Sequence, residues 1–163
     1  MSVKPRDNAA MRFRFPRALV LAAAVGLPQA TLAQLPPDQL DPFGQATAGF
    51  ARCPPVPPPR LMPDEMRASA HARAERGTRC AMEGTCEPGG VYRRDSEINA
   101  QVIAAIAGDP RFRDTAVWVT TSRHWVTLQG CVRGTAQRKA LVAFVGRQPR
   151  VERVFDELSR GAR

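Results

Sequence analysis

Cysteine and histidine are the residues best suited to metal or covalent chemistry, and this 163-residue chain has four of the first and two of the second. Structural zinc sites usually hold their cysteines in short repeats such as CxxC. The cysteines here are Cys53, Cys80, Cys86 and Cys131, which lack that spacing, and adding His71 to three of them does not create it. We therefore predict neither a metal site nor a cofactor.

Groups that could act in acid–base catalysis are scattered along the chain. His71 lies in an Arg/Ala-rich stretch and His124 in a predicted turn, and neither belongs to a nucleophile motif. The sequence has no GxSxG, HExxH, phosphate-loop or dinucleotide-binding pattern. No spacing pairs Glu97 with Glu152 or Asp156. We predict that the chain is not an enzyme.

The two tryptophans are more informative. Trp118 and Trp125 fall on one face of a predicted β-hairpin, near Arg123 and, from a later strand, Phe155. These four residues form a candidate binding site for a partner protein, a polymer or a membrane interface, because tryptophan combines an apolar ring with a polar N–H. The structural alternative is that a helix at 64–76 or the proline-rich segment covers both rings.

The hairpin that must position these rings is predicted from two runs of β-branched and aromatic residues, 115–120 and 125–132. We expect it to close at Ser122-Arg123, which places Trp118 opposite Thr127. Alternation then puts a second set of residues on the core-facing side. These residues are Val117, Val119, Val126, Leu128 and Val132.

Two helices and a third strand complete the predicted domain. An apolar stripe predicts a first helix that Ser96 caps and Gly108 ends, and a second helix begins at Gly134 and ends at Gln148. Residues 151–158 are predicted as a strand. The helix positions expected in the core are Ile98, Val102, Ile103, Ile106, Ala140, Leu141, Phe144 and Val145. The order α-β-β-α-β predicts an α+β sandwich, with two helices on a three-stranded sheet.

Proline dominates the preceding segment, residues 34–93, which holds ten of the fifteen prolines. Because proline fixes φ and lacks an N–H, the CPPVPPPR stretch at 53–60 should be an extended polyproline II spacer. A PxxP ligand is the alternative. A weak helix is expected at 64–76, ended by Gly77. The segment as a whole is predicted to be a partly disordered arm.

The first 33 residues have the organisation of a signal peptide. Five cations precede the apolar run 18–27, and small residues follow at 30–33. Ten apolar residues are too few to span a bilayer, which needs about 20. We expect cleavage after Ala33, a periplasmic product and no transmembrane span after cleavage. Met11 is an alternative start.

The formal net charge of +9 is distributed unevenly. The predicted signal peptide carries +4, residues 34–93 have seven cations and seven anions, and the rest of the chain has twelve cations against seven anions, or +5. Export removes the usual nucleic-acid target. The basic charge therefore predicts an anionic envelope surface as partner and no nucleic acid.

Export also favours disulfide formation, since the periplasm is oxidising. Four cysteines allow three pairings, with free structural thiols as the alternative. The preferred pairing joins Cys80 to Cys86 across a short loop and Cys53 to Cys131 over a long one. The second bond would tether the proline segment to the sheet.

Residues from about 95 to 160 resemble the BON domain family. The resemblance rests on the element order, on the hairpin pattern Val117-x-Val119 with Val126-x-Leu128-x-Gly130-x-Val132, and on the closing Val151-x-x-Val154-x-x-x-Leu158. Two turns depart from the family's usual pattern. Arg123-His124 and Arg150 stand where glycine is expected.

The resemblance implies a non-catalytic periplasmic module that binds a phospholipid membrane or an envelope polymer. The expected organisation is a signal peptide at 1–33, the proline-rich arm at 34–93 and a BON-like domain at 94–160. The alternative function is a structural subunit that docks another envelope protein through the Trp118/Trp125 face.

Overall fold

The computed structural model of the chain describes residues 38–161. The signal peptide predicted at residues 1–33 lies outside them. In chain order the elements are β1 (Phe43–Ala48), α1 (Pro63–Met82), α2 (Asp95–Gly108), the 3₁₀ helix η1 (Pro110–Phe112), β2 (Ala116–Ser122), β3 (Trp125–Val132), α3 (Thr135–Val145) and β4 (Arg153–Arg160).

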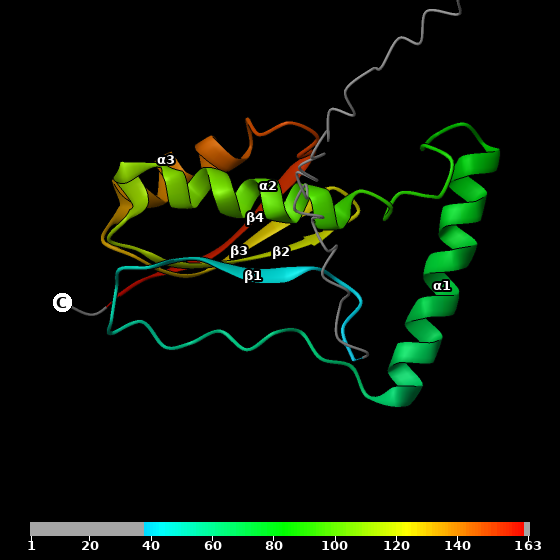
Figure 1. Cartoon of the computed structure of the whole chain (residues 1–163), viewed down its shortest axis with the longest axis horizontal. Coiled ribbons are helices and arrows are strands. Elements are labelled where there is room, and N and C mark those ends of the chain that lie inside the picture. The colour runs from blue at the N-terminus through cyan, green and yellow to red at the C-terminus, as the bar shows by residue number, and fades with distance from the viewer. Residues whose placement is uncertain (1–37, 162–163) are drawn as a thin grey trace, which may run out of the picture. The chain divides into compact units, whose positions relative to one another are not determined.

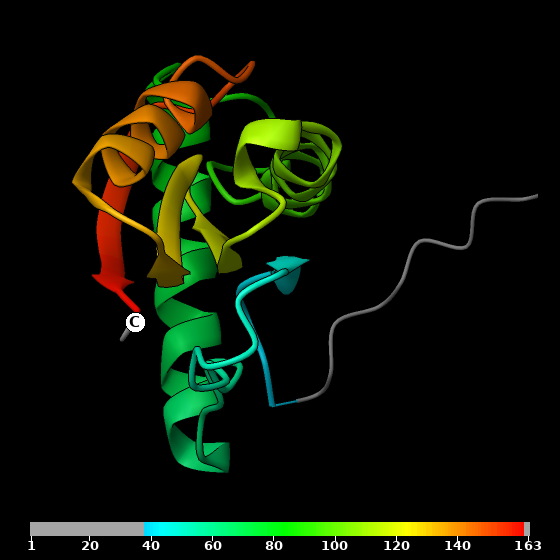
Figure 2. The same ribbon diagram turned by 90° about the vertical axis from the view of Figure 1, so that its left-hand side faces the viewer.

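The strands form one mixed sheet in the order β1-β2-β3-β4. The pairs β1–β2 and β2–β3 are antiparallel, whereas β3 and β4 are parallel. Helices α2 and α3 lie next to each other on one face of this sheet (Figures 1 and 2). The α+β architecture predicted from the sequence is confirmed.

The sheet has one strand more than predicted, because β1 belongs to the segment expected to be a proline-rich arm. Its sequence, FGQATA, carries little β-branched or aromatic signal. The strand forms by pairing with β2, with an irregularity between Gln45 and Thr47. The hydroxyls of Thr47 and Thr115 also share a 2.8 Å hydrogen bond. Pairing with β2 therefore stabilises a strand that the residues of β1 would not favour by themselves.

The core lies between the sheet and the helices α2 and α3. Every residue predicted on the inner side of the hairpin is fully buried, and the helices contribute Ile98, Val102, Ile106, Leu141 and Val145. Ile103, Ala140 and Phe144 pack at its margin and are partly buried. The period-two and four-residue patterns therefore predicted the core correctly.

The hairpin turn differs from the prediction by one residue. Ser122 pairs with Trp125, so Arg123 and His124 form a two-residue turn with positive φ angles of 56° and 63°. Trp118 consequently lies opposite Gln129 and not Thr127. Turns of this hand usually contain Asn-Gly or Asp-Gly, and no such dipeptide marked the position here.

Three boundaries also need correction. Helix α2 begins at Asp95, and Ser96 is exposed in its first turn and makes no capping hydrogen bond. Strand β4 begins at Arg153, because Arg150, with φ of 62°, still belongs to the preceding turn. Helix α1 does not end at Gly77 but continues to Met82.

Gly77 is a packing residue and not a helix terminator. A Cβ on Gly90 would lie 2.8 Å from the Cα of Gly77, so the two backbones approach more closely than side chains would permit. No residue of α1 is buried. The helix is held instead by this contact and by Arg73, which pairs with Asp41 at 2.7 Å and stacks over the Tyr92 ring.

Candidate functional site

The sheet face opposite α2 and α3 has a covered half and an open half. Trp118 belongs to the covered half and is only 8% exposed. It packs in a small cluster with Phe50, Ala116 and Cys131, against which Val56 of the proline segment also packs. The segment runs back along this side of the sheet towards α1 (Figure 1). Trp118 is therefore not available at the surface, contrary to the expectation of one site containing both indoles.

A disulfide between Cys53 and Cys131 fastens the proline segment to β3, with a Cα–Cα distance of 5.7 Å. The second disulfide joins Cys80 and Cys86. Both are the pairs preferred from the sequence. The sequence offered two segments that could cover the tryptophan rings, the helix at 64–76 and the proline segment. In the structure the proline segment covers Trp118 and not Trp125.

The open half carries what we call the aromatic–arginine patch, made of Arg123, Trp125, Arg153 and Phe155. The Trp125 and Phe155 rings meet edge to face with centroids 5.8 Å apart, and Phe155 is 39% exposed. The Cζ of Arg123 lies 4.0 Å from the centroid of the Trp125 ring, and that of Arg153 lies 5.1 Å from it. The structure thus brings together three of the four predicted residues.

Arg153 was missed in the sequence although a signal for it existed. It lies two residues before Phe155, so alternation puts both on one face of β4. The parallel register then places Arg153 beside Trp125. Without knowledge of which strand β4 pairs with, and in which direction, that neighbour could not be identified.

The two arginines of the patch differ from other arginines of the domain in their ionic partners. Within residues 38–161, Arg123 and Arg153 have no carboxylate partner, whereas Arg94, Arg111 and Arg138 form ion pairs. The two distances to the Trp125 centroid limit the separation of the Arg123 and Arg153 Cζ atoms to 9.1 Å, their sum. Two guanidiniums without a carboxylate partner therefore lie beside an aromatic pair in which Phe155 is exposed and Trp125 is half-buried.

The turn that precedes Trp125 is held from α2. The Asp95 carboxylate accepts hydrogen bonds from the backbone N–H groups of Arg123 (2.8 Å) and His124 (2.9 Å). Asp95 is 3% exposed, and burial raises the pKa of its carboxyl although these two bonds act in the opposite direction. His124 Nδ1 lies 3.1 Å from Glu152, whose N–H donates to the His124 carbonyl.

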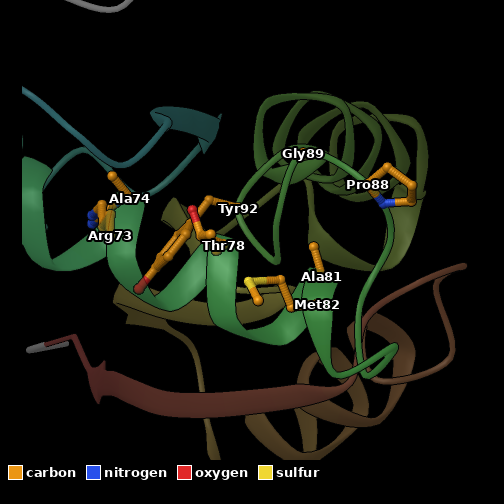
Figure 3. Close-up of a pocket in the computed structure, with 9 residues that line it drawn as sticks. Arg73, Ala74, Thr78, Ala81, Met82, Pro88, Gly89 and Tyr92 are labelled. Atoms are coloured by element: carbon orange, nitrogen blue, oxygen red, sulfur yellow. The ribbon is translucent and has the colours of Figure 1, made fainter.

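Three grooves lie elsewhere on the described part of the chain. One, of about 720 Å³, runs between α1 and residues 88–92, and Figure 3 shows Tyr92 across its middle with Met82 near one end. Its lining is mostly apolar, and Arg73 at the other end is already paired with Asp41. A second, of about 600 Å³, lies along α1, and its lining includes His71, Glu75 and Met82. The third, of about 270 Å³, separates the proline segment from β3 and β4. His71 belongs to the lining of the second groove, and none of the three linings contains a free thiol.

The two histidines stay apart from each other in the fold. His71 is exposed on α1, 3.3 Å from Glu75, and His124 lies in the hairpin turn. Among residues 38–161, no helix combines the length and apolar character required to cross a bilayer.

Comparison with known proteins gives one finding. No curated protein and no solved structure matches the chain significantly. The family model of the BON domain matches residues 94–162, which contain α2, β2, β3, α3 and β4. At the level of the family, this match indicates a non-catalytic module that binds phospholipid or other envelope components. Residues 94–162 of this chain are a BON domain.

Proposed function

We propose that the chain is an exported, periplasmic protein whose BON domain binds an anionic phospholipid surface through the aromatic–arginine patch. The observation that carries the proposal is the contact of the exposed Phe155 ring with the half-buried Trp125 ring, beside two arginines that lack carboxylate partners in the described structure. The BON assignment and the signal-peptide pattern of residues 1–33 support a location in the cell envelope.

The chemistry of the patch suits a membrane interface. Tryptophan prefers the headgroup level, where its ring meets apolar chains and its N–H meets water. An arginine near an anionic surface contributes about 1 kcal/mol of attraction. Stacking on Trp125 orients the Arg123 guanidinium, so less side-chain freedom is lost when it meets a phosphate. The net charge of +5 from Arg94 onward adds a weaker, longer-range attraction.

Co-sedimentation with vesicles tests the proposal, using the purified chain with its amino terminus determined by mass spectrometry. We expect binding to vesicles that contain phosphatidylglycerol, little binding to pure phosphatidylcholine, and weakening as salt is raised. Arg153→Ala should weaken binding about fivefold, which corresponds to about 1 kcal/mol. Trp125→Ala should weaken it at least as much.

Arg147→Ala is the matched control, because Arg147 is also exposed and without a carboxylate partner in the described residues but follows α3 on the helical side. It should change binding less than twofold. Equal losses for Arg147→Ala and Arg153→Ala would show that net charge alone attracts the chain. Equal binding to both kinds of vesicle would exclude the phospholipid proposal.

Docking of another envelope protein across both tryptophans has less support. That surface requires Trp118, which the proline segment and the disulfide at Cys131 cover. A protein partner would have to use the smaller patch around Trp125 and Phe155. Capture of an envelope protein that Trp125→Ala abolishes, without any vesicle binding, would favour this reading.

A further inference from the structure

We propose that Asp95 is a positioning residue for the aromatic–arginine patch, and that its buried carboxylate holds the hairpin turn in the conformation that presents Arg123 and Trp125. The inference rests on the proposed function for what the patch binds. How the turn is held is a separate matter that can be measured without any ligand.

The turn needs external support because its backbone is strained. Arg123 and His124 both have positive φ, 56° and 63°, a conformation in which the Cβ of an ordinary residue crowds the backbone. Glycine and asparagine usually occupy the two positions of such a turn. Neither residue occurs here, so the local sequence does not favour the conformation by itself.

Asp95 supplies that support from another element. Its two oxygens each accept one backbone N–H of the turn, at 2.8 Å from Arg123 and 2.9 Å from His124. Hydrogen bonds to an ionised acceptor are about twice as strong as neutral ones. Because the carboxylate is 3% exposed, loss of Asp95 would leave both N–H groups with no comparable acceptor.

The turn contacts Trp125 directly and, through Glu152, is connected to the start of β4. Arg123 belongs to it and stacks on Trp125, the first residue of β3. The His124 carbonyl accepts the N–H of Glu152 at 3.0 Å, which fixes the residue immediately before Arg153. A turn that relaxes to negative φ would move Arg123 away from the indole and loosen the start of β4.

The decisive comparison is between Asp95→Ala and Asn99→Ala. Asn99 lies one helical turn further along α2, is also buried (4% exposed), and donates to Pro42, Val119 and Thr121. Both substitutions remove a buried polar side chain of the same helix, but only Asp95 forms hydrogen bonds with the turn residues Arg123 and His124. All variants are compared below their melting temperatures, so that each is folded.

Two readouts separate positioning from general stability. The first is ¹⁵N–¹H NMR without lipid, which follows the Arg123 and His124 amides and the Trp125 indole N–H, assigned with Trp125→Phe. Asp95→Ala should shift all three signals and speed hydrogen exchange of the two amides, whereas Asn99→Ala should not. The second is co-sedimentation with phosphatidylglycerol vesicles, where we expect a loss of about fivefold for Asp95→Ala and less than twofold for Asn99→Ala.

A glycine placed at the turn provides the rescue. Glycine adopts positive φ without a Cβ clash, so Asp95→Ala/His124→Gly should recover much of the lost binding. If Asp95→Ala fails to fold, Asp95→Asn, which retains one oxygen acceptor, takes its place in both measurements.

The outcomes distinguish this inference from the proposed function. Unchanged turn amides in Asp95→Ala, or equal effects of Asp95→Ala and Asn99→Ala on them, would overturn the positioning role. If the wild-type chain binds no vesicles, the phospholipid proposal fails while the NMR comparison still decides whether Asp95 holds the turn.

Discussion

Arg123, His124 and Arg150 are the non-glycine residues with positive φ in the described structure, and they lie in the two turns where the resemblance to the BON family leads us to expect a glycine. At the first two positions the Asp95 carboxylate compensates for the missing conformational freedom. At the third, the guanidinium of Arg150 lies 3.5 Å from Glu97. Both carboxylates belong to the first turn of α2. Each of the two turns without glycine is therefore contacted by an acidic residue from the amino end of α2.

The raised pKa of Asp95 gives a pH dependence of definite sign. Burial raises this pKa above its ordinary value of 3.8, so the folded chain binds the proton more tightly than the unfolded chain. The contribution of Asp95 to stability should therefore fall as pH rises from the ordinary value through the raised one, and then remain constant. The unfolding free energy of the wild type minus that of Asp95→Asn should decrease in urea titrations as the pH rises above the ordinary pKa of 3.8.

Other acids do not obscure this difference. Hydrogen bonding to Arg94 lowers the pKa of Glu87, and hydrogen bonding to Arg111 lowers that of Asp109. Glu87 and Asp109 stabilise the fold above their ordinary pKa, and this stabilisation is lost as the pH falls. Because they titrate alike in the wild type and in Asp95→Asn, their contributions cancel in the difference. A difference that stays flat or increases with pH would contradict the prediction.

Position 130 favours glycine for two reasons, a positive φ angle and the closeness of neighbouring atoms. Its φ is 112°, and a Cβ there would lie 2.1 Å from the Ala116 carbonyl oxygen and 3.0 Å from the Trp118 ring. Gly130→Ala should lower the unfolding free energy by roughly 2 to 4 kcal/mol, from backbone strain plus overpacking. Gly108→Ala is the control, since no atom lies near a Cβ built there, and its effect should stay within about 1 kcal/mol. Similar thermal unfolding of the two variants would refute this reading.

Among the elements, the proline segment acts as a cover because a disulfide holds it in place. Cys53 and Cys131 are 78 residues apart, for which chain entropy alone predicts about 4.5 kcal/mol of stabilisation, against about 2 kcal/mol for the loop of Cys80 and Cys86. Cys53→Ser with Cys131→Ser should therefore destabilise the fold more than the corresponding change at the short loop. It should also increase quenching of tryptophan fluorescence, as Trp118 becomes accessible. Equal destabilisation with unchanged quenching would argue against the cover.

Strand β4 forms one edge of the sheet, and side chains form hydrogen bonds with two of its backbone groups. The Asp156 carboxylate accepts the N–H of Leu158 at 3.2 Å, and Arg138 donates to the Asp156 carbonyl at 3.2 Å. Free edges promote pairing between chains, so these contacts should keep the edge from associating. Asp156→Ala should raise the share of dimers and larger species in analytical ultracentrifugation.

Glu157→Ala is the control for that experiment. This substitution also removes one negative charge, at the residue that follows Asp156. The Glu157 carboxylate accepts a hydrogen bond from Gln129 on the outer face and does not bond to the edge. We expect it to leave the sedimentation profile unchanged. If both variants associate to the same extent, loss of negative charge and not exposure of the edge is responsible.

For the molecule as a whole, the segment before the BON domain completes the fold. It supplies β1, which pairs with β2, and it supplies Phe50 and Val56, which pack with Trp118. A fragment containing residues 94–163 would lack both and expose the edge of β2. We expect it to melt at a lower temperature than residues 38–163 and to bind more of a hydrophobic dye. Equal melting temperatures would show that the domain is self-sufficient.

The sequence by itself determined the parts of this protein that depend on local pattern. Alternating valines and the four-residue stripe of isoleucines and valine in α2 placed the core, because burial of one face imposes those periods on strands and helices. The preferred cysteine pairing and the BON resemblance also followed from residue types and their spacing.

Only the tertiary structure decided which half of the outer sheet face is open. Strand β1 has little β signal of its own, the turn at 123–124 has no glycine, and Arg153 meets Trp125 only through the parallel pairing of β4. Each of these features depends on partners from distant parts of the chain. Contacts such as those of Asp95 with the turn and of the proline segment with Trp118 override local propensity, so a pattern read along the chain cannot contain them.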